Sequence, residues 1–201
     1  MQRAWSVQLF AVLIFSAGNA MAQASHQPTV QEAGPAAKSK RSAHQQVVAK
    51  FFQQRSQLQQ QAKAAFDREM ARQKAGDCPH ARSTYDENIC LGKAIHTTLA
   101  NYQSFSGALR SLLGQKNPMM GAVLGDMIGP TGKPLTAEQM TKEFDQVEAE
   151  WETYRKAQCS AAYDLFKGGT VAPSMGGLCE LKLIRSRMTD LNSVYDMTLH
   201  H

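Results

Sequence analysis

The residues in this chain best suited to a defined chemistry are its four cysteines, Cys78, Cys90, Cys159 and Cys179. In an oxidising compartment such residues pair as disulfides, whereas in the cytosol they more often bind metal or carry out redox reactions. The chain lacks the C-x-x-C motif typical of thiol–disulfide exchange. Cys78-Pro79-His80 places one histidine beside one cysteine, but no second ligand pair stands at zinc spacing. The cysteines therefore favour structural disulfides over a metal site.

Four cysteines allow three connectivities, and the sequence alone does not choose among them. Cys78 is close to Cys90 in the chain and Cys159 is close to Cys179, so the shortest loops predict these two bonds. Closing loops of such lengths would stabilise the fold by about 3 kcal/mol each through the entropy of the unfolded chain.

No other residues form a catalytic motif. The chain has neither G-x-S-x-G nor H-E-x-x-H, and His96 stands alone on a predicted helix. The glycine-rich stretch 121–132 lacks the G-K-[ST] that cradles phosphate. The acidic residues are scattered or are expected on solvated helix faces: Asp77, Asp86, Glu87, Glu148, Glu150 and Glu152. We therefore expect a protein that is not an enzyme and that uses no cofactor or metal.

The N-terminus predicts export. Arg3 precedes the apolar run Leu9–Phe15, and Ala20-Met21-Ala22 matches the small-x-small pattern of a signal-peptide cleavage site. The alternative is a membrane anchor, but the run is shorter than the roughly 20 apolar residues that span a bilayer. We expect residues 1–22 to be removed, which leaves no membrane span and a soluble periplasmic or secreted protein. A net charge of +5 does not by itself indicate nucleic-acid binding.

Composition divides the exported part into a linker and two helical regions. Residues 23–43 carry proline, glycine and small residues without apolar periodicity, which predicts a flexible linker. Residues 44–76 are rich in glutamine, and their apolar side chains recur at spacings of three and four, which predicts a long amphipathic helix. An extended, partly ordered arm is the alternative. Residues 78–199 form the third unit, which contains all four cysteines.

Three further helices are expected, at 84–113, 136–167 and 178–198, because apolar residues recur there at spacings of three and four. The stripe of the first comprises Leu91, Ile95, Leu99, Tyr102, Phe105, Leu109 and Leu112, and that of the second comprises Met140, Phe144, Val147, Trp151, Tyr154, Ala161 and Leu165. Thr84 with Glu87, and Thr136 with Gln139, have the spacing of capping boxes at the first two starts. No stretch alternates between apolar and polar residues as a half-buried strand does. The predicted fold class is therefore all-α, an antiparallel helical bundle stapled by two disulfides with an additional long N-terminal helix.

The segment 114–134 is a predicted loop with an unusually apolar content. Glycine and proline punctuate it, which disfavours a long helix. Its apolar residues either pack on the core or form a binding surface. The second reading gives a candidate partner-binding set, which comprises Lys116, Met119, Met120, Met127 and Lys133.

Trp151, Arg155 and Cys159 are spaced four apart, so they share one face of the 136–167 helix. The structural interpretation is that Trp151 is buried in the core, that the stem of Arg155 covers it, and that a carboxylate or the carbonyls at a helix end hold the Arg155 guanidinium. The functional alternative places Trp151 on a binding surface. Arg187, on the last predicted helix, is another possible member of this cluster.

The order of these residues resembles the LprI-type lysozyme-inhibitor family over about residues 78–199. The match rests on Thr84, Glu87, the four cysteines, Trp151-x-x-Tyr154-Arg155-x-x-x-Cys159, Gly168-Gly169 and Arg187. The resemblance implies an exported helical domain that carries disulfides and inhibits lysozyme. The sequence therefore suggests two functions: a non-catalytic envelope protein that blocks a lysozyme or related muramidase, or a periplasmic protein- or cell-wall-binding module without inhibitory activity. The basic charge counts against the first, because many lysozymes are also basic.

Overall fold

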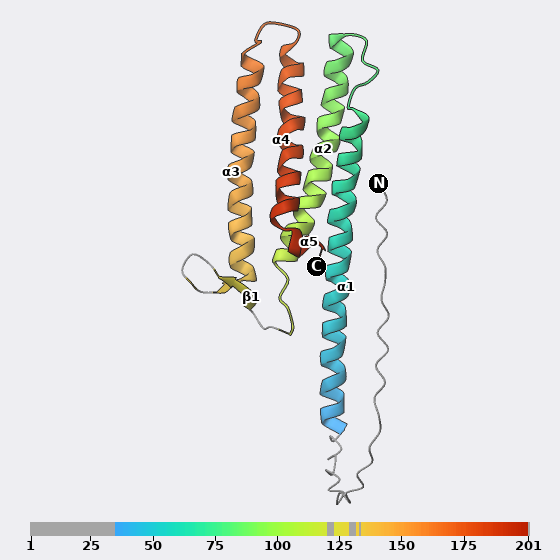
Figure 1. Cartoon of the computed structure of the whole chain (residues 1–201), viewed down its shortest axis with the longest axis vertical. Coiled ribbons are helices and arrows are strands. Elements are labelled where there is room, and N and C mark those ends of the chain that lie inside the picture. The colour runs from blue at the N-terminus through green and yellow to red at the C-terminus, as the bar shows by residue number, and fades with distance from the viewer. Residues whose placement is uncertain (1–34, 120–122, 129–131, 133, 201) are drawn as a thin grey trace, which may run out of the picture.

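The computed structural model describes residues 35–119, 123–128, 132 and 134–200, and most of this part of the chain is an antiparallel helical bundle. The long helices are α1 (Pro35–Ala75), α2 (Thr84–Leu113), α3 (Ala137–Asp164) and α4 (Ala172–Val194), and α5 (Asp196–His200) is short. Successive long helices run in opposite directions (Figure 1). The helix α4 packs against both α2 and α3, while α1 packs mainly on α2. The predicted all-α bundle is confirmed.

The core forms where the apolar stripe of α2 meets α4 and α1. Phe105 and Leu109 of α2 and Ile184 and Met188 of α4 have no exposed surface. Burying each such side chain contributes about 1.5–3 kcal/mol of transfer free energy. The sequence pattern of α2 predicted this face correctly.

The stripe predicted on α3 is only partly correct. Met140 and Phe144 are buried, but Val147, Tyr154 and Leu165 are exposed. Beyond Phe144 the inward face of α3 is instead formed by Glu148, Trp151, Arg155 and Cys159, a mixed polar and apolar series at spacings of three and four. The apolar pattern alone predicts the wrong face there, because charged residues occupy part of the buried face.

Both predicted disulfides are present. Cys78 is bonded to Cys90 with a Cα–Cα distance of 5.9 Å, and Cys159 to Cys179 with a distance of 5.4 Å. The first joins the α1–α2 connection to α2, and the second joins the end of α3 to the start of α4. Both therefore lie at the same end of the bundle, at the top of Figure 1.

The two predicted capping boxes have different outcomes. At α3, Thr136 and Gln139 form the reciprocal capping box. At α2 the prediction is wrong, because Ser83 is the N-cap and its hydroxyl accepts a hydrogen bond from the Asp86 backbone N–H at 3.1 Å. Thr84 is then the first helical residue. The Glu87 carboxylate does not cap the helix but accepts a hydrogen bond from the Ser174 hydroxyl of α4 at 3.2 Å.

The last long helix starts earlier than expected, at Ala172 rather than residue 178. Pro173 is tolerated because it stands in the first turn, where no helical partner exists for its missing N–H. Gly176 and Gly177 lie inside α4, and they permit close helix packing. A Cβ atom on Gly177 would lie 3.4 Å from Ile95 Cδ1 and 3.5 Å from Leu91 Cβ of α2.

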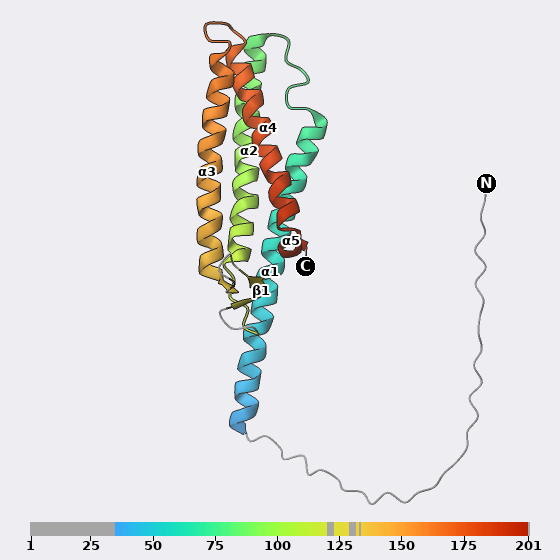
Figure 2. The same ribbon diagram turned by 60° about the vertical axis from the view of Figure 1, so that its left-hand side comes forward.

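The N-terminal helix also starts earlier, at Pro35 rather than His44. Residues 23–34 of the predicted linker and the predicted signal peptide lie outside the described residues. The first part of α1 extends past the end of the bundle in both views of the ribbon (Figures 1 and 2). No helix in the described ranges has an apolar stretch long enough to cross a lipid bilayer.

The expectation of no sheet is wrong between α2 and α3. There β1 (Val123–Ile128) pairs antiparallel with β2 (Pro134–Thr136), and β2 leads directly into α3. Gly132 has a φ of 72°, a conformation that glycine adopts at little cost. The sequence did not predict these strands, because glycine and proline interrupt the alternation of apolar and polar residues. The pairing also joins residues on opposite sides of a turn, such as Val123 and Thr136, which a local pattern does not relate.

Candidate functional site

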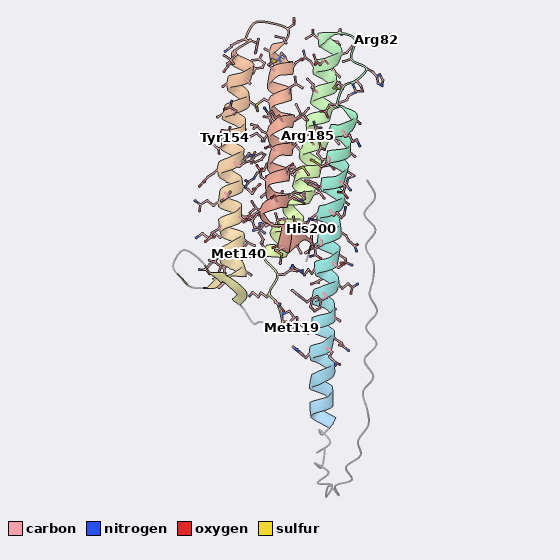
Figure 3. All side chains as sticks on the ribbon, viewed as in Figure 1. Arg82, Met119, Met140, Tyr154, Arg185 and His200 are labelled. Carbon is pink, nitrogen blue, oxygen red and sulfur yellow. A yellow bond between two sulfur atoms is a disulfide. The ribbon has the colours of Figure 1, made fainter. Side chains whose placement is uncertain are left out.

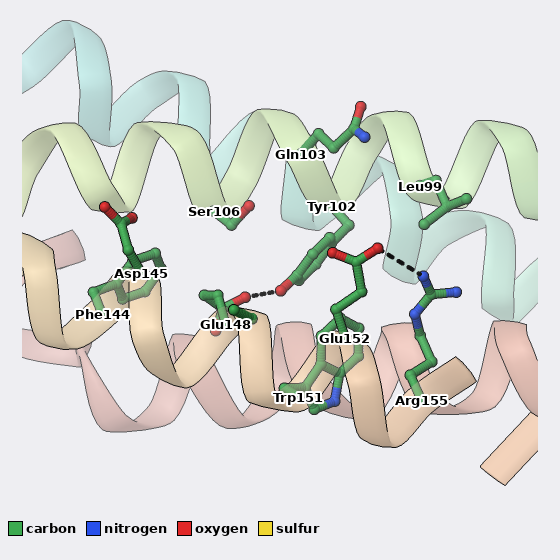
Figure 4. A pocket seen from close by; sticks show the side chains of 11 residues that line it. Leu99, Tyr102, Gln103, Ser106, Phe144, Asp145, Glu148, Trp151, Glu152 and Arg155 are labelled. Atoms are coloured by element: carbon green, nitrogen blue, oxygen red, sulfur yellow. Dashed lines mark hydrogen bonds and ion pairs between the residues drawn. The ribbon is translucent and has the colours of Figure 1, made fainter. Parts of the chain in front are cut away.

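Trp151 and Arg155, two residues that carry the family resemblance, line an open groove of about 360 Å³ between α2 and α3. Figure 4 shows that α2 contributes Leu99, Tyr102, Gln103 and Ser106 to this groove, and α3 contributes Phe144, Asp145, Glu148, Trp151, Glu152 and Arg155. The indole of Trp151 lies 5.1 Å from the Tyr102 ring, measured between centroids. The guanidinium carbons of Arg155 and Arg187 lie 5.6 Å and 6.0 Å from the Trp151 ring centroid. These distances are within the range of cation–π attraction.

Trp151 is only partly buried, so the expected full burial is not observed. Its ring packs against the main core while one part faces the groove. Tyr154 does not join the cluster, because it is exposed and projects from α3 away from the neighbouring helices (Figure 3).

Arg155 connects α3 to α4 as expected of a fixed, buried arginine. Its side chain is 8 % exposed and forms an ion pair with Glu180 of α4. A second carboxylate, that of Glu152, lies 3.9 Å away on the same helix. Burial lowers the pKa of Arg155, and the Glu152 charge opposes that shift. The carboxylate contact predicted for Arg155 is therefore present.

Glu148 connects three helices through its carboxylate. It accepts hydrogen bonds from the Tyr102 hydroxyl of α2 and from Arg187 Nε of α4, the latter at 3.0 Å. Burial raises the pKa of Glu148, and the hydrogen bond from Arg187 partly offsets this shift. The hydrogen bonds of Glu148 with Tyr102 and Arg187 therefore join three helices of the bundle. This supports the structural interpretation of Trp151, Arg155 and Arg187.

We expect Trp151→Ala to lower the free energy of unfolding by about 3 kcal/mol, because the ring contacts residues of three helices but keeps part of its surface in solvent. Urea unfolding followed by circular dichroism measures this change. Tyr154→Ala, an exposed aromatic residue one turn along α3, is the matched control and should stay within about 0.5 kcal/mol of the parent. A Trp151→Ala protein with unchanged stability and impaired partner binding would contradict the structural role.

A second polar cluster, centred on Glu69, was missed by sequence reasoning. Glu69 of α1 has no exposed surface, and its carboxylate accepts hydrogen bonds from Thr98 Oγ1 at 2.7 Å, Asn101 Nδ2 at 2.9 Å and Arg185 Nε at 2.8 Å. The two terminal nitrogens of Arg185 donate to the Asp77 carboxylate at 2.7 and 2.6 Å. These hydrogen bonds raise the pKa of Arg185, with Asp77 as the larger cause.

One signal in the sequence could have revealed the Glu69 cluster. Glu69 falls on the same helical face as Ala62 and Ala65, and Arg185 stands beside Ile184 on the inward face of α4. A charged residue on a buried stripe requires an opposite charge from another element, because an unpaired buried charge is strongly destabilising. Only the assembled bundle shows that this partner is Arg185 of α4, which is labelled in Figure 3.

The end of the bundle that carries both disulfides presents a cluster of exposed apolar side chains, which we name the disulfide end. Its members, with their exposed fractions, are Tyr85 (73 %), Tyr163 (40 %), Leu165 (81 %), Phe166 (41 %) and Val171 (39 %). Gly168 and Gly169, singled out in the sequence, form the turn within it. Gly168 has a φ of 90°, which an L side chain rarely adopts, and the Thr170 carbonyl accepts a hydrogen bond from Asn88 Nδ2 at 3.3 Å.

The partner-binding residues predicted in the segment 114–134 are described only in part. Lys116 is exposed, and Met119 is exposed at the end of the bundle opposite the disulfides (Figure 3). Met120 and Lys133 lie outside the described residues, and so does the side chain of Met127, although its backbone belongs to β1. A partner contact through this segment stays a prediction.

Together, the fold and these clusters define a class of small helical bundle, held at one end by two disulfides and joined inside by arginine–carboxylate pairs. The family model described as "Lysozyme inhibitor LprI" matches residues 77–191. This match covers more than half of the chain, so the protein belongs to the LprI lysozyme-inhibitor family. No curated protein and no solved structure gives a significant match.

Proposed function

We propose that the protein is an exported, non-catalytic inhibitor that binds a lysozyme or related muramidase and blocks it. The family match over residues 77–191 carries this proposal, because it includes both disulfides and the Trp151 cluster. Disulfides persist in oxidising compartments, which supports a periplasmic or secreted location.

The charge distribution removes the electrostatic objection to a basic partner. Within residues 77–191 there are 12 Lys and Arg against 13 Asp and Glu, so the net charge of the matched region is −1. The positive charge of the whole chain therefore lies outside the family domain. A nearly neutral domain does not repel a basic lysozyme as a uniformly basic chain would.

The disulfide end is the contact surface that the described side chains favour. It combines exposed aliphatic and aromatic side chains with Lys167, whose side chain is 76 % exposed, on a connection anchored by Cys159–Cys179. Partner-binding residues concentrate on loops held by a rigid scaffold. The cleft of a lysozyme contains two catalytic carboxylates, which an ammonium group can complement.

The 114–134 segment is a second candidate contact. Lys116 supplies an exposed cation there, next to the exposed Met119. Arg110, another cation near this segment, is already engaged, because its Nε and Nη2 atoms donate to the Asp145 carboxylate at 2.6 Å each. The hydrogen bond from Arg110 lowers the pKa of Asp145.

A lysis assay tests the proposal directly. Purified protein should slow the clearing of a cell-wall suspension by lysozyme in a concentration-dependent manner. The double change Leu165→Ser with Lys167→Glu should raise the inhibitory concentration by about tenfold or more, because a few central contacts dominate most interfaces. The matched control is Val194→Ser with Lys142→Glu, which changes an exposed valine and lysine elsewhere on the bundle and should leave inhibition unchanged.

Two other results would redirect the proposal. If the disulfide-end change has no effect but a Gly/Ser replacement of residues 117–132 abolishes inhibition, the contact is the 114–134 segment. If the folded parent protein neither binds nor inhibits a panel of lysozymes, the alternative function stands, a periplasmic module that binds another protein or a cell-wall component without inhibiting lysozyme.

A further inference from the structure

The positive charge of this protein is concentrated in the first half of α1, most of which extends beyond the bundle. We name residues 35–55 the basic arm. It contains Lys38, Lys40, Arg41, Lys50 and Arg55 and no acidic residue. The whole chain has 22 Lys and Arg against 17 Asp and Glu, so outside the arm the two signs balance at 17 each. The arm therefore accounts for the entire net charge of +5.

The arm also carries apolar side chains that the bundle leaves uncovered. Val47 is 55 % exposed and Phe52 is 49 % exposed, while Val48 and Phe51 are partly exposed. The rings of Phe51 and Phe52 pack edge to face with centroids 5.3 Å apart. Val48 and Phe51 continue the helix face that packs into the bundle farther along α1, and Val47 and Phe52 flank it. The ribbon views show the first part of α1 extending past the ends of the other long helices (Figures 1 and 2).

The connection of α1 to the rest of the protein begins where the arm ends. Arg55 Nη2 and Gln59 Nε2 both donate to the Thr198 carbonyl of α5, at 3.2 and 3.1 Å. From Leu58 onward the apolar side chains of α1 join the main core. The bundle thus holds α1 firmly by its second half and presents the first half as a projecting helix.

We propose that the basic arm is an interfacial helix that attaches the protein to an anionic phospholipid surface. Helices of this type lie in the membrane plane, with apolar side chains inserted below the headgroups and Lys and Arg paired with lipid phosphates. Each Lys or Arg near such a surface contributes about 1 kcal/mol, and long basic side chains reach the headgroups while their stems stay apolar. The absence of acidic residues from the arm matches this partner.

Two other occupants fit the arm less well. A second copy of the arm would bring five positive charges against five others with no acidic residue to pair them. A soluble polyanion would satisfy the charges but leave Val47 and Phe52 in water. A lipid surface satisfies both the cations and the apolar side chains. This inference is independent of lysozyme inhibition, which we assign to the family domain.

Vesicle sedimentation tests the attachment. A chain that begins at Gln23 keeps every described residue and excludes the apolar leader from the measurement. It should bind phosphatidylglycerol vesicles at low salt and dissociate from them at high salt, because salt screens the charges. It should not bind vesicles of pure phosphatidylcholine. The triple change Lys38→Gln, Lys40→Gln and Arg41→Gln should weaken binding by about a hundredfold.

The matched control removes three exposed cations from the bundle instead: Lys93→Gln, Lys142→Gln and Lys182→Gln. This control should bind vesicles as the parent chain does. The double change Val47→Ser with Phe52→Ser should weaken vesicle binding by about tenfold while leaving binding to soluble polyphosphate unchanged. Circular dichroism checks that each variant keeps the bundle.

Several outcomes would overturn the proposal. Equal binding to phosphatidylcholine and phosphatidylglycerol would show that the cations are not used. Full vesicle binding by the serine variant would show that the arm is only a polyanion site. Self-association that is lost in the serine variant, together with no vesicle binding, would assign the face to a second copy of the chain.

Discussion

Arg185→Ala is expected to lower the free energy of unfolding by about 3 kcal/mol, because it removes the more buried of the two guanidinium groups that pair with a fully buried carboxylate and leaves only the Arg72 pair, at 3.2 Å. Glu69 has no exposed surface, and Arg185 is its partner from α4 at 2.8 Å. The same guanidinium binds both oxygens of Asp77, directly before the first disulfide. One substitution therefore removes the hydrogen bonds of Arg185 that join α4 to α1 and to the α1–α2 connection. Urea unfolding followed by circular dichroism measures the loss.

Arg110→Ala is the matched control for the Arg185 change. Arg110 also makes a bidentate ion pair with one carboxylate, that of Asp145, but both side chains are about half exposed. Exposed ion pairs contribute little, because water and salt screen them. The stability should therefore change little. Equal effects of the Arg185 and Arg110 changes would show that burial does not govern the Glu69 cluster.

Cys159→Ser with Cys179→Ser is expected to lower the free energy of unfolding by about 3 kcal/mol and to weaken inhibition of lysozyme. The bond closes a chain separation of 20 residues, and losing it increases the entropy of the unfolded chain. It also anchors the connection that carries Leu165, Phe166 and Lys167. A looser connection must lose conformational entropy on binding, which reduces affinity.

Cys78→Ser with Cys90→Ser separates the two effects. This bond has a comparable separation of 12 residues but closes the α1–α2 connection, where it does not hold Leu165 or Lys167. We expect a similar loss of stability and a smaller loss of inhibition. Thermal unfolding and the lysis assay, run below the unfolding temperature of both variants, provide the comparison. If both variants inhibit as the parent does, the disulfide end is not the contact surface.

The charge distribution suggests that the two proposed functions belong to different parts of the chain. The family domain is nearly neutral and carries the disulfide end, while the basic arm holds the net positive charge and projects from the opposite end of the bundle. With the arm in the membrane plane, the bundle would run along the lipid surface and the disulfide end would lie at the end of the bundle remote from the attached segment. The two proposals are thus geometrically compatible and are tested by separate measurements.

The sequence by itself determined the features that depend on local pattern. The period of apolar residues located α2 and its buried face, and the Thr136–Gln139 spacing located the start of α3. The two disulfides were predicted from the short separation of the cysteines in each pair, because short loops close at the lowest entropic cost. The family resemblance came from the same residues, and the match to residues 77–191 confirms it.

Only the tertiary structure decided which polar residues are buried and with what partners. Glu69 and Arg185 are 116 positions apart, and the local ion pair of Glu69 with Arg72 does not reveal this long-range pair. Gly177 resembles a helix breaker in the sequence, yet it lies inside α4, where it is buried against Leu91 and Ile95 of α2. The pairing of β1 with β2 likewise depends on contacts across a turn. Local pattern shows which faces a helix has, but the packing of several helices decides which of those faces meet.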